Sequence, residues 1–214
     1  MPGPGPNPAA EIHLTGTQVL ETTTGEHKIT CQFVFLEEGL VTSGKELTFK
    51  KITLQGCNLG DKRCFHPEIQ ETGTIEFEGP YKAELGFIPG SKIASNPWVG
   101  VDLKNENPRS PGAMFEAFCG EPFPASPTHK LKVTGSVIGR VKPPNKMVEN
   151  NEFLLSYKQS AGVQIPTAFI GGVEDVLEET LTKITPPETV YEGKVGLAAP
   201  GELKLQESME IKAR

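Results

Sequence analysis

Polar and apolar residues alternate with a period of two along most of this chain, and turn residues separate the alternating stretches. Successive side chains of a β-strand point to opposite faces, so this period predicts strands with one buried face. Gly-Pro, Pro-Gly and Asn-Pro pairs between the stretches favour turns. The predicted strands cover residues 11–20, 27–36, 47–54, 73–78, 81–88, 98–103, 113–119, 129–141, 151–158, 189–195 and 202–212.

Two stretches depart from short, simple alternation. Residues 129–141 form a long strand that contains Gly135 and Gly139, and glycines inside a strand often mark a bend or a bulge. We therefore expect this strand to serve two sheets. Residues 172–181 are the one stretch predicted as a short helix, because acidic residues lie in its first turn, where the helix dipole favours them.

The spacing of strands and turns predicts an all-β fold, an antiparallel β-sandwich or barrel-like arrangement with at most one short helix. With 214 residues, the chain is long enough to bury a core as one large domain or two small ones. We expect a Pro/Gly-rich extension over residues 1–10 and a single β domain over residues 11–214. Two tightly packed sandwiches are the variant, with a sub-boundary near residues 143–150.

A cysteine lies on the apolar face of one predicted strand. In residues 27–36, the side chains of Ile29, Cys31, Phe33 and Phe35 fall on the same face. We expect that face to be buried, and Cys31 therefore to point inward.

The four cysteines, Cys31, Cys57, Cys64 and Cys119, form an even set that allows two disulfides in three pairings. Four reduced thiols are one alternative. A zinc site at Cys57, Cys64 and His66 is another, but the spacing lacks the paired Cys-x(2–4)-Cys hooks of structural zinc. We prefer Cys31 with Cys57, on two successive strand-like segments, and Cys64 with Cys119, because the six residues between Cys57 and Cys64 resemble a surface turn.

Disulfides favour an oxidising compartment, so an extracellular or cell-surface location is expected. The chain begins Met-Pro-Gly-Pro-Gly-Pro and shows no leader peptide, which fits either a cytosolic protein or a mature form. A net charge of −6 opposes binding to nucleic acid or to anionic membrane surfaces. No apolar run reaches the roughly 18 residues that a membrane span needs, so none is predicted.

The residue pattern predicts no catalytic, cofactor-binding or metal-binding site, and we expect a protein that is not an enzyme. Ser136 alternates within a strand and lacks the spacing of a nucleophile elbow. Residues 42–45, Thr-Ser-Gly-Lys, lack the upstream glycine of a phosphate-binding loop and predict a hairpin turn. An enzyme of the glycoside hydrolase type remains an alternative, with two carboxylates drawn from glutamates that alternate with apolar residues, Glu76, Glu78, Glu84 and Glu116.

Carbohydrate binding is a further alternative, because sugar rings stack on exposed aromatic side chains. Trp98 and Tyr81 are the candidate ligand contacts. The competing interpretation places Trp98 at the edge of the core, since it follows Asn96-Pro97 at the start of a strand.

A series of short motifs resembles, in its order, that of exported actinobacterial proteins of unknown function. The resemblance covers most of the chain after about residue 28 and implies export, but it implies no catalytic residue. The motifs are Gly56-Cys57, Val99-Gly100-Val101-Asp102-Leu103, Val133-Thr134-Gly135-Ser136-Val137-Ile138-Gly139, Asn145-Lys146-Met147, Gly171-Gly172 and Glu210-Ile211-Lys212.

These observations predict a non-catalytic secreted or cell-surface protein with a structural, adhesive or self-assembly role. The expected partner is a second copy of the chain or a surface glycan. In the self-assembly version, residues 11–20 form an N-terminal strand that pairs with an open sheet edge of a neighbouring molecule.

Overall fold

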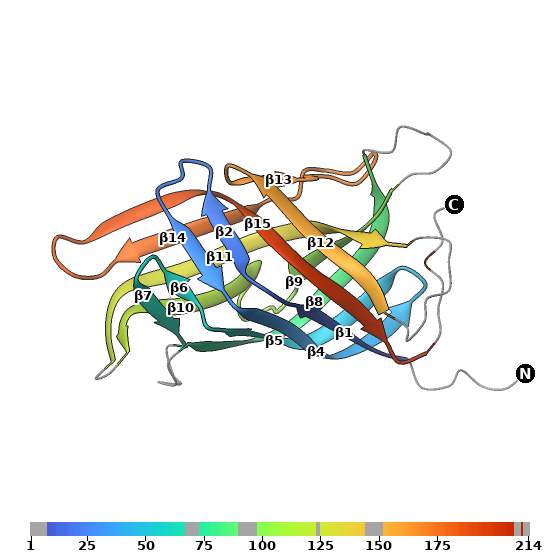
Figure 1. Cartoon of the computed structure of the whole chain (residues 1–214), viewed down its shortest axis with the longest axis horizontal. Coiled ribbons are helices and arrows are strands. Elements are labelled where there is room, and N and C mark those ends of the chain that lie inside the picture. The colour runs from blue at the N-terminus through green and yellow to red at the C-terminus, as the bar shows by residue number, and fades with distance from the viewer. Residues whose placement is uncertain are drawn as a thin grey trace, which may run out of the picture.

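The computed structural model describes residues 8–66, 73–89, 98–122, 125–143, 152–207 and residue 211. Within these residues the chain forms strands joined by turns and contains no helix, which confirms the all-β prediction (Figure 1). The strands are β1 (Ala9–Leu14), β2 (Gln18–Thr22), β3 (Lys28–Cys31), β4 (Phe33–Ser43), β5 (Glu46–Gln55), β6 (Asn58–Leu59), β7 (Lys62–Phe65), β8 (Thr74–Ile88), β9 (Trp98–Asn105), β10 (Ala113–Pro122), β11 (Ala125–Lys142), β12 (Glu152–Ser160), β13 (Val163–Ile165), β14 (Leu177–Lys183) and β15 (Thr189–Leu205).

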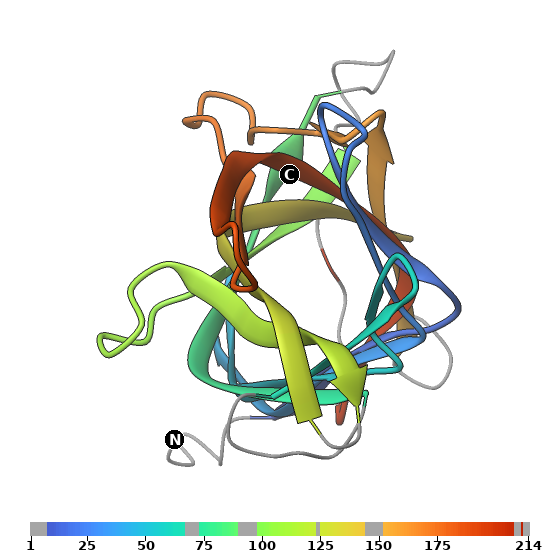
Figure 2. The same cartoon turned by 90° about the vertical axis from the view of Figure 1, so that its left-hand side faces the viewer.

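The antiparallel pairings close into two rings. The first ring runs β1, β4, β5, β8, β9, β11, β12, β15 and returns to β1. The second ring runs β10, β11, β14, β15, β2, β3, β6, β7 and returns to β10. Seen from one end, the strands run around a common centre (Figure 2). Closure satisfies the main-chain groups that an open sheet would leave at its edges.

The two long strands β11 and β15 belong to both rings. β11 pairs with β14 as far as Gly135 and with β9 from Ser136 onward. Gly135 has a φ of 98°, a conformation that glycine adopts without strain, and it marks the point where β11 passes between the rings. The prediction that this strand bends to serve two sheets is confirmed.

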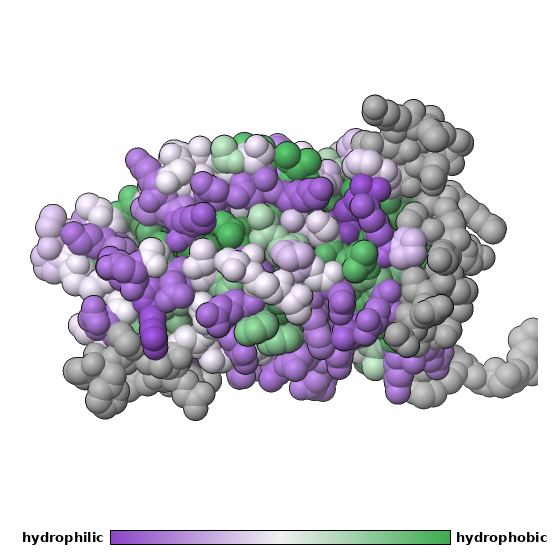
Figure 3. All heavy atoms as spheres, viewed as in Figure 1, coloured by the Kyte–Doolittle hydropathy of each residue, from purple (hydrophilic) through white to green (hydrophobic). Residues whose placement is uncertain are grey.

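One hydrophobic cluster fills the interior of both rings. Its largest fully buried side chains include Phe49, Tyr81 and Phe153 of the first ring and Ile29 and Leu131 of the second. Polar side chains cover most of the face shown in Figure 3, with small apolar patches between them. The period-two pattern therefore separates inside from outside as the sequence predicts.

The two disulfides have the preferred pairing. Cys31 is bonded to Cys57, and Cys64 is bonded to Cys119, with Cα–Cα distances of 4.0 Å in both. Cys64 and Cys119 lie opposite each other on β7 and β10, so this bridge crosses two paired strands of the second ring. All four cysteines are buried, and none is free.

The helix predicted over residues 172–181 is wrong. Residues 177–181 belong to β14, which pairs with β11 on one side and β15 on the other. Leu177, Glu179 and Leu181 alternate toward the interior, and the inward-facing Glu179 hides this period of two from a hydropathy pattern. Hydrogen bonding of β14 to β11 and to β15 outweighs the local helical preference of these residues.

The predicted strand 27–36 is divided in two, and its buried face changes at Gln32. Cys31 points inward as expected, but Phe33 is 41% exposed, while Val34 and Leu36 are buried. The break between β3 and β4 shifts the alternation by one residue, which moves the following side chains to the opposite face.

The N-terminal strand expected to pair with a neighbouring molecule has no free edge. It is divided into β1, which pairs with β4 and β15, and β2, which pairs with β3 and β15. Both edges of β1 and both edges of β2 are thus paired with strands of the same chain. β1 already begins at Ala9, inside the predicted extension, and most of the sub-boundary near residues 143–150 lies outside the described residues.

The described part of the chain has no helix with the length and apolar character needed to cross a membrane.

Candidate functional site

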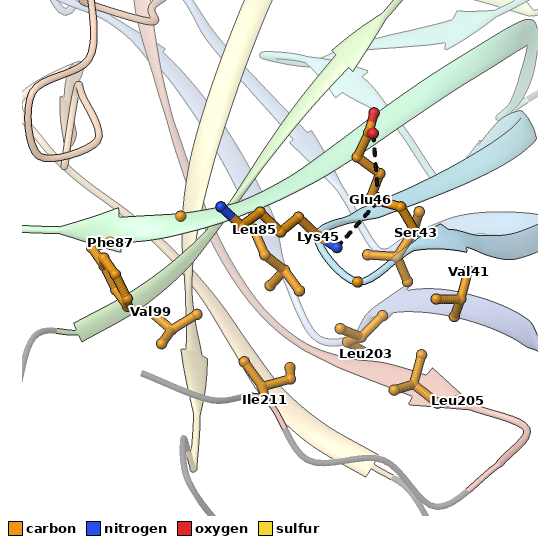
Figure 4. Close-up of a pocket in the computed structure, with 13 residues that line it drawn as sticks. Val41, Ser43, Lys45, Glu46, Leu85, Phe87, Val99, Leu203, Leu205 and Ile211 are labelled. Atoms are coloured by element: carbon orange, nitrogen blue, oxygen red, sulfur yellow. Dashed lines mark hydrogen bonds between the residues drawn. The ribbon is translucent and has the colours of Figure 1, made fainter. Parts of the chain in front are cut away.

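A cavity of about 360 Å³ lies at one end of the first ring, and we call it the mouth cavity (Figure 4). It is bounded by the β4–β5 turn, by the ends of β8 and β15, by the start of β9 and by Ile211. Its lining residues are Val41, Ser43, Gly44, Lys45, Glu46, Leu47, Leu85, Gly86, Phe87, Val99, Leu203, Leu205 and Ile211.

Strand alternation places the apolar side chains of this lining. Leu85 and Phe87 are two residues apart on β8, and Leu203 and Leu205 are two residues apart on β15, so each pair points to the same side of its strand. Gly86, between the first two, lies against the ring of Phe169: a Cβ there would come within 2.6 Å of it. The Phe169 ring therefore packs closely against β8 at Gly86.

The lining changes from exposed to buried residues. Ser43 and Lys45 are exposed and Leu85 is half-buried, whereas Leu47 and Leu203 are almost completely buried. The cavity therefore extends from the solvent-facing turn toward the interior of the ring. A site with this gradient can take up an apolar group from water without opening the core.

Among the residues that the structure describes, the rim carries one positive charge without an ion-pair partner. Glu46 forms an ion pair and hydrogen bond with Lys82, and this hydrogen bond, with the charge of Lys82, lowers the pKa of Glu46. Ser43 donates a hydrogen bond of 3.5 Å to Glu46. Lys45 takes part in no ion pair among the described residues, and in Figure 4 its side chain extends along the cavity edge toward β8.

A second cavity of about 40 Å³ lies where the two rings meet. Its wall is apolar except for Gln18 of β2 and Tyr157 of β12, whose side chains are at least 98% buried. The Oε1 atom of Gln18 and the hydroxyl of Tyr157 have no hydrogen-bond partner among the described residues. The volume suits one or a few water molecules rather than an organic ligand.

A cluster of polar side chains extends from the buried Glu179 of the second ring to the exposed Thr24. The Nδ1 atom of His27 is 3.5 Å from Oε1 of Glu179, and the ring of Tyr191 contacts His27 edge-on at a centroid distance of 4.5 Å. Thr24 and Tyr191 share a hydrogen bond of 2.9 Å between their hydroxyls. Burial raises the pKa of Glu179 to about 7 and lowers the pKa of His27, so near neutral pH Glu179 is only partly ionised and the neutral form of His27 is favoured.

A buried carboxyl group lies on the outer side of the first ring. Asp102 of β9 is 6% exposed, and Ser136 of β11 donates a hydrogen bond of 2.9 Å to the nearby Asp175. Burial, and after it the charge of Asp175, raise the pKa of Asp102 to about 7, although Lys104 and a hydrogen bond with Ser136 oppose the shift. Asp102 is therefore partly protonated near neutral pH.

Replacing Asp102 by Asn should make the protein more stable at pH 8 and flatten its pH dependence. Folded Asp102 keeps its proton up to about pH 7, and unfolded Asp102 loses it near pH 4, so the free energy of unfolding falls between these values as pH rises. We expect Asp102→Asn to be stabilising by up to about 4 kcal/mol at pH 8, because the pKa shift spans about three units, and close to neutral at pH 4.

Urea unfolding at several pH values measures this difference. Asp61→Asn, at an exposed turn position, is the control and should leave the slope unchanged. Because Glu179 also has a raised pKa, Asp102→Asn should remove only part of the slope. Equal slopes for wild type and Asp102→Asn would contradict the prediction.

The two aromatic candidates do not form a ligand platform together. Tyr81 is completely buried, and its hydroxyl donates a hydrogen bond of 2.5 Å to the carbonyl of Met114. Its ring therefore offers no surface to a sugar. Trp98 is half-buried, and the guanidinium of Arg140 lies 3.5 Å from its ring centroid, so one ring face is already covered.

The glutamates weighed for glycoside hydrolysis lie on half-exposed or exposed positions of the strands. Glu76 pairs with Lys51, Glu84 with Lys82, and Glu116 with Lys130 and Lys132. The Glu84–Lys82 pair lies within β8 and the others join neighbouring strands, and such exposed ion pairs are typical of a solvated sheet face. Glu78 is exposed as well.

No group of three or more His, Cys, Asp or Glu side chains is arranged to hold a metal ion within the part of the chain that the structure describes. Cys57 and Cys64, which the zinc alternative needs as ligands, are both in disulfides.

The sequence contains only part of the signal for the mouth cavity. The hairpin turn predicted at residues 42–45 is confirmed between β4 and β5, and it carries the polar rim. Leu85 and Phe87 alternate in a predicted strand. Their convergence with Leu203 and Leu205 depends on ring closure, which alternation does not encode.

Comparison with protein-family models, with curated proteins and with solved structures found no match to this chain.

Proposed function

We propose that this chain is a non-catalytic, exported binding protein that holds a small apolar molecule in the mouth cavity. The observation that carries the proposal is the cavity itself, about 360 Å³ in volume and walled mainly by aliphatic and aromatic side chains. Ligand pockets in proteins usually span roughly 300–1,000 Å³ and combine apolar walls with a few polar groups.

The closed ring supports this proposal because it holds the cavity walls in place. β4, β5, β8, β9 and β15 contribute lining residues, and each is paired on both sides over some part of its length. A ring of eight strands is wide enough to be filled by side chains or to hold one small ligand. Binding to such a preformed site avoids most of the entropy cost of ordering it.

The chemistry of the lining favours binding over catalysis. Its polar side chains are Ser43, Lys45 and Glu46, and Glu46 is already engaged by Lys82. The acid–base pair His27 and Glu179 lies in the second ring and does not line this cavity. Acyl transfer would require a nucleophile activated by a base. Ser43 is hydrogen-bonded to Glu46, but Lys82 holds that carboxylate and lowers its pKa, which makes Glu46 a weak base.

Export is part of the same proposal. The two disulfides are compatible with an extracellular location, since such bonds persist in oxidising compartments. The resemblance to exported actinobacterial proteins agrees with this location and stays a prediction. A structural, adhesive or self-assembly role also stays a prediction, and glycan binding has little support from the positions of Tyr81 and Trp98.

The cavity should bind the apolar fluorescent probe N-phenylnaphthylamine, and Leu85→Trp should weaken that binding at least about tenfold. Leu85 is a half-buried wall residue, so a larger side chain there takes up cavity volume. Fluorescence titration measures the dissociation constant of each variant, and a tenfold change corresponds to about 1.4 kcal/mol.

The matched control is Leu154→Trp. Leu154 is 60% exposed on β12 and lies outside the cavity lining, so probe binding should be unchanged. Val41→Trp, at another half-buried wall position, replaces Leu85→Trp if the latter fails to fold. The proposal fails if wild type does not brighten the probe, or if both wall variants bind it as wild type does.

A further inference from the structure

The mouth cavity has a polarity that points to one class of ligand. We propose that it binds amphipathic anions, with the apolar chain in the cavity and a carboxylate-type head group at Lys45. This inference rests on the proposed function and adds the chemistry of the head group. The observation behind this proposal is that the unpaired ammonium of Lys45 lies beside an apolar cavity.

Three lysines on the strands that line the cavity are paired with carboxylates. Lys82 binds Glu46, Lys104 binds Glu106, and Lys204 binds both Glu152 and Glu202. Lys45 has no carboxylate partner among the described residues, and its contact with Leu85 is a backbone one, in which the Lys45 carbonyl accepts a hydrogen bond from the Leu85 N–H. Lys45 is therefore the lining residue that leaves a positive charge uncompensated.

Glu46, the acidic residue of the lining, is not available to bind a cationic head group. The carboxylate of Glu46 is neutralised by Lys82, whose own pKa is raised by the same hydrogen bond. A cationic head group would have to displace Lys82, whereas an anionic head group meets a lysine that is free. The rim thus discriminates between the two charges.

The position of Lys45 suits a head group at the water boundary. Its residue is exposed at the β4–β5 turn, and Figure 4 shows the side chain along the cavity edge, above Leu85. A lysine stem can lie on an apolar surface while the ammonium stays in water. A bound anion would then place its chain among Leu85, Phe87 and Leu203 and keep its charge hydrated.

Because the net charge is −6, a preference for anionic over cationic head groups can arise only from the groups close to the cavity. The field of the whole protein repels anions, so any preference for them must come from the rim. A single exposed ion pair contributes modestly, and more where an apolar wall lowers the local dielectric constant. We expect the Lys45 contact to tighten anion binding about three- to tenfold.

The test compares decanoate with decanol as competitors of bound N-phenylnaphthylamine. Lys45→Met keeps the stem and removes the charge, and it should weaken decanoate about three- to tenfold while changing decanol less than about twofold. Lys158→Met is the matched control, because Lys158 is exposed on β12, has no ion pair among the described residues and does not line the cavity. It should leave both affinities as in wild type.

The outcomes separate this proposal from the function on which it rests. Equal effects of Lys45→Met on decanoate and decanol, or the same loss in Lys158→Met, would overturn the head-group proposal and leave the apolar cavity standing. Failure of both ligands to displace the probe, or failure of the probe to bind, would overturn both. A decanoate preference that declines as salt rises from 50 mM to 1 M would add support, since screening weakens an exposed ion pair.

Discussion

Removing the bridge between Cys64 and Cys119 should lower the free energy of unfolding by about 4 kcal/mol, because this bond closes a loop of 55 residues in the unfolded chain. The cost arises mainly in the unfolded state, which gains conformational freedom once the loop is open. The bond also joins directly opposed positions of β7 and β10, so its loss loosens one closing pair of the second ring.

The double variant Cys64→Ala/Cys119→Ala tests this expectation by guanidinium unfolding under oxidising conditions. Cys31→Ala/Cys57→Ala is the matched comparison and should cost somewhat less, since its loop spans 26 residues and closure entropy grows with the logarithm of loop length. A midpoint equal to that of wild type in both variants would show that the bridges contribute no stability.

Gly135→Ala should destabilise the protein by about 3–5 kcal/mol or prevent its folding, because the junction of the two rings has no space for a methyl group. A Cβ at this position would lie 2.0 Å from the carbonyl oxygen of Val176, a backbone atom that cannot rotate away. The φ of 98° adds strain for any residue with a side chain. Relief requires β11 or the start of β14 to shift.

Two glycine variants separate the contributions at this junction. Gly112 has a φ of 70° but open space where a Cβ would lie. Gly112→Ala should therefore show only the backbone strain, a loss of about 1 kcal/mol in the free energy of unfolding. Gly44→Ala, in the β4–β5 turn, has neither a close contact nor a positive φ and should be close to neutral. Urea unfolding of the three variants gives the comparison, and a Gly135→Ala variant as stable as Gly112→Ala would contradict the proposed clash.

Predictions from the sequence succeeded where local chemistry decides the structure. Strand alternation, the hairpin at residues 42–45 and the bend of the strand that contains Gly135 all follow from side-chain period and turn residues. They failed where a partner strand decides. The residues of β14 have a helical pattern in isolation, but they lie between β11 and β15 and complete two ladders.

The candidate site could likewise be predicted only in part. The sequence places Leu85 and Phe87 on one face of a strand and Lys45 in a turn, but it assigns no shared cavity to them. Tyr81, a candidate surface aromatic in the sequence, is buried because its strand closes the first ring and its hydroxyl reaches Met114.

The sequence by itself determined the all-β class, the positions of most strands and the separation of inward from outward side chains, because these depend on neighbours one or two residues away. The tertiary structure alone decided that β1 pairs with β15 and that β11 and β15 join two rings. It also decided that an apolar cavity opens at one end beside Lys45, which has no ion-pair partner among the described residues. These features depend on contacts between distant segments, and the loop closures that form them leave no periodic trace in the chain.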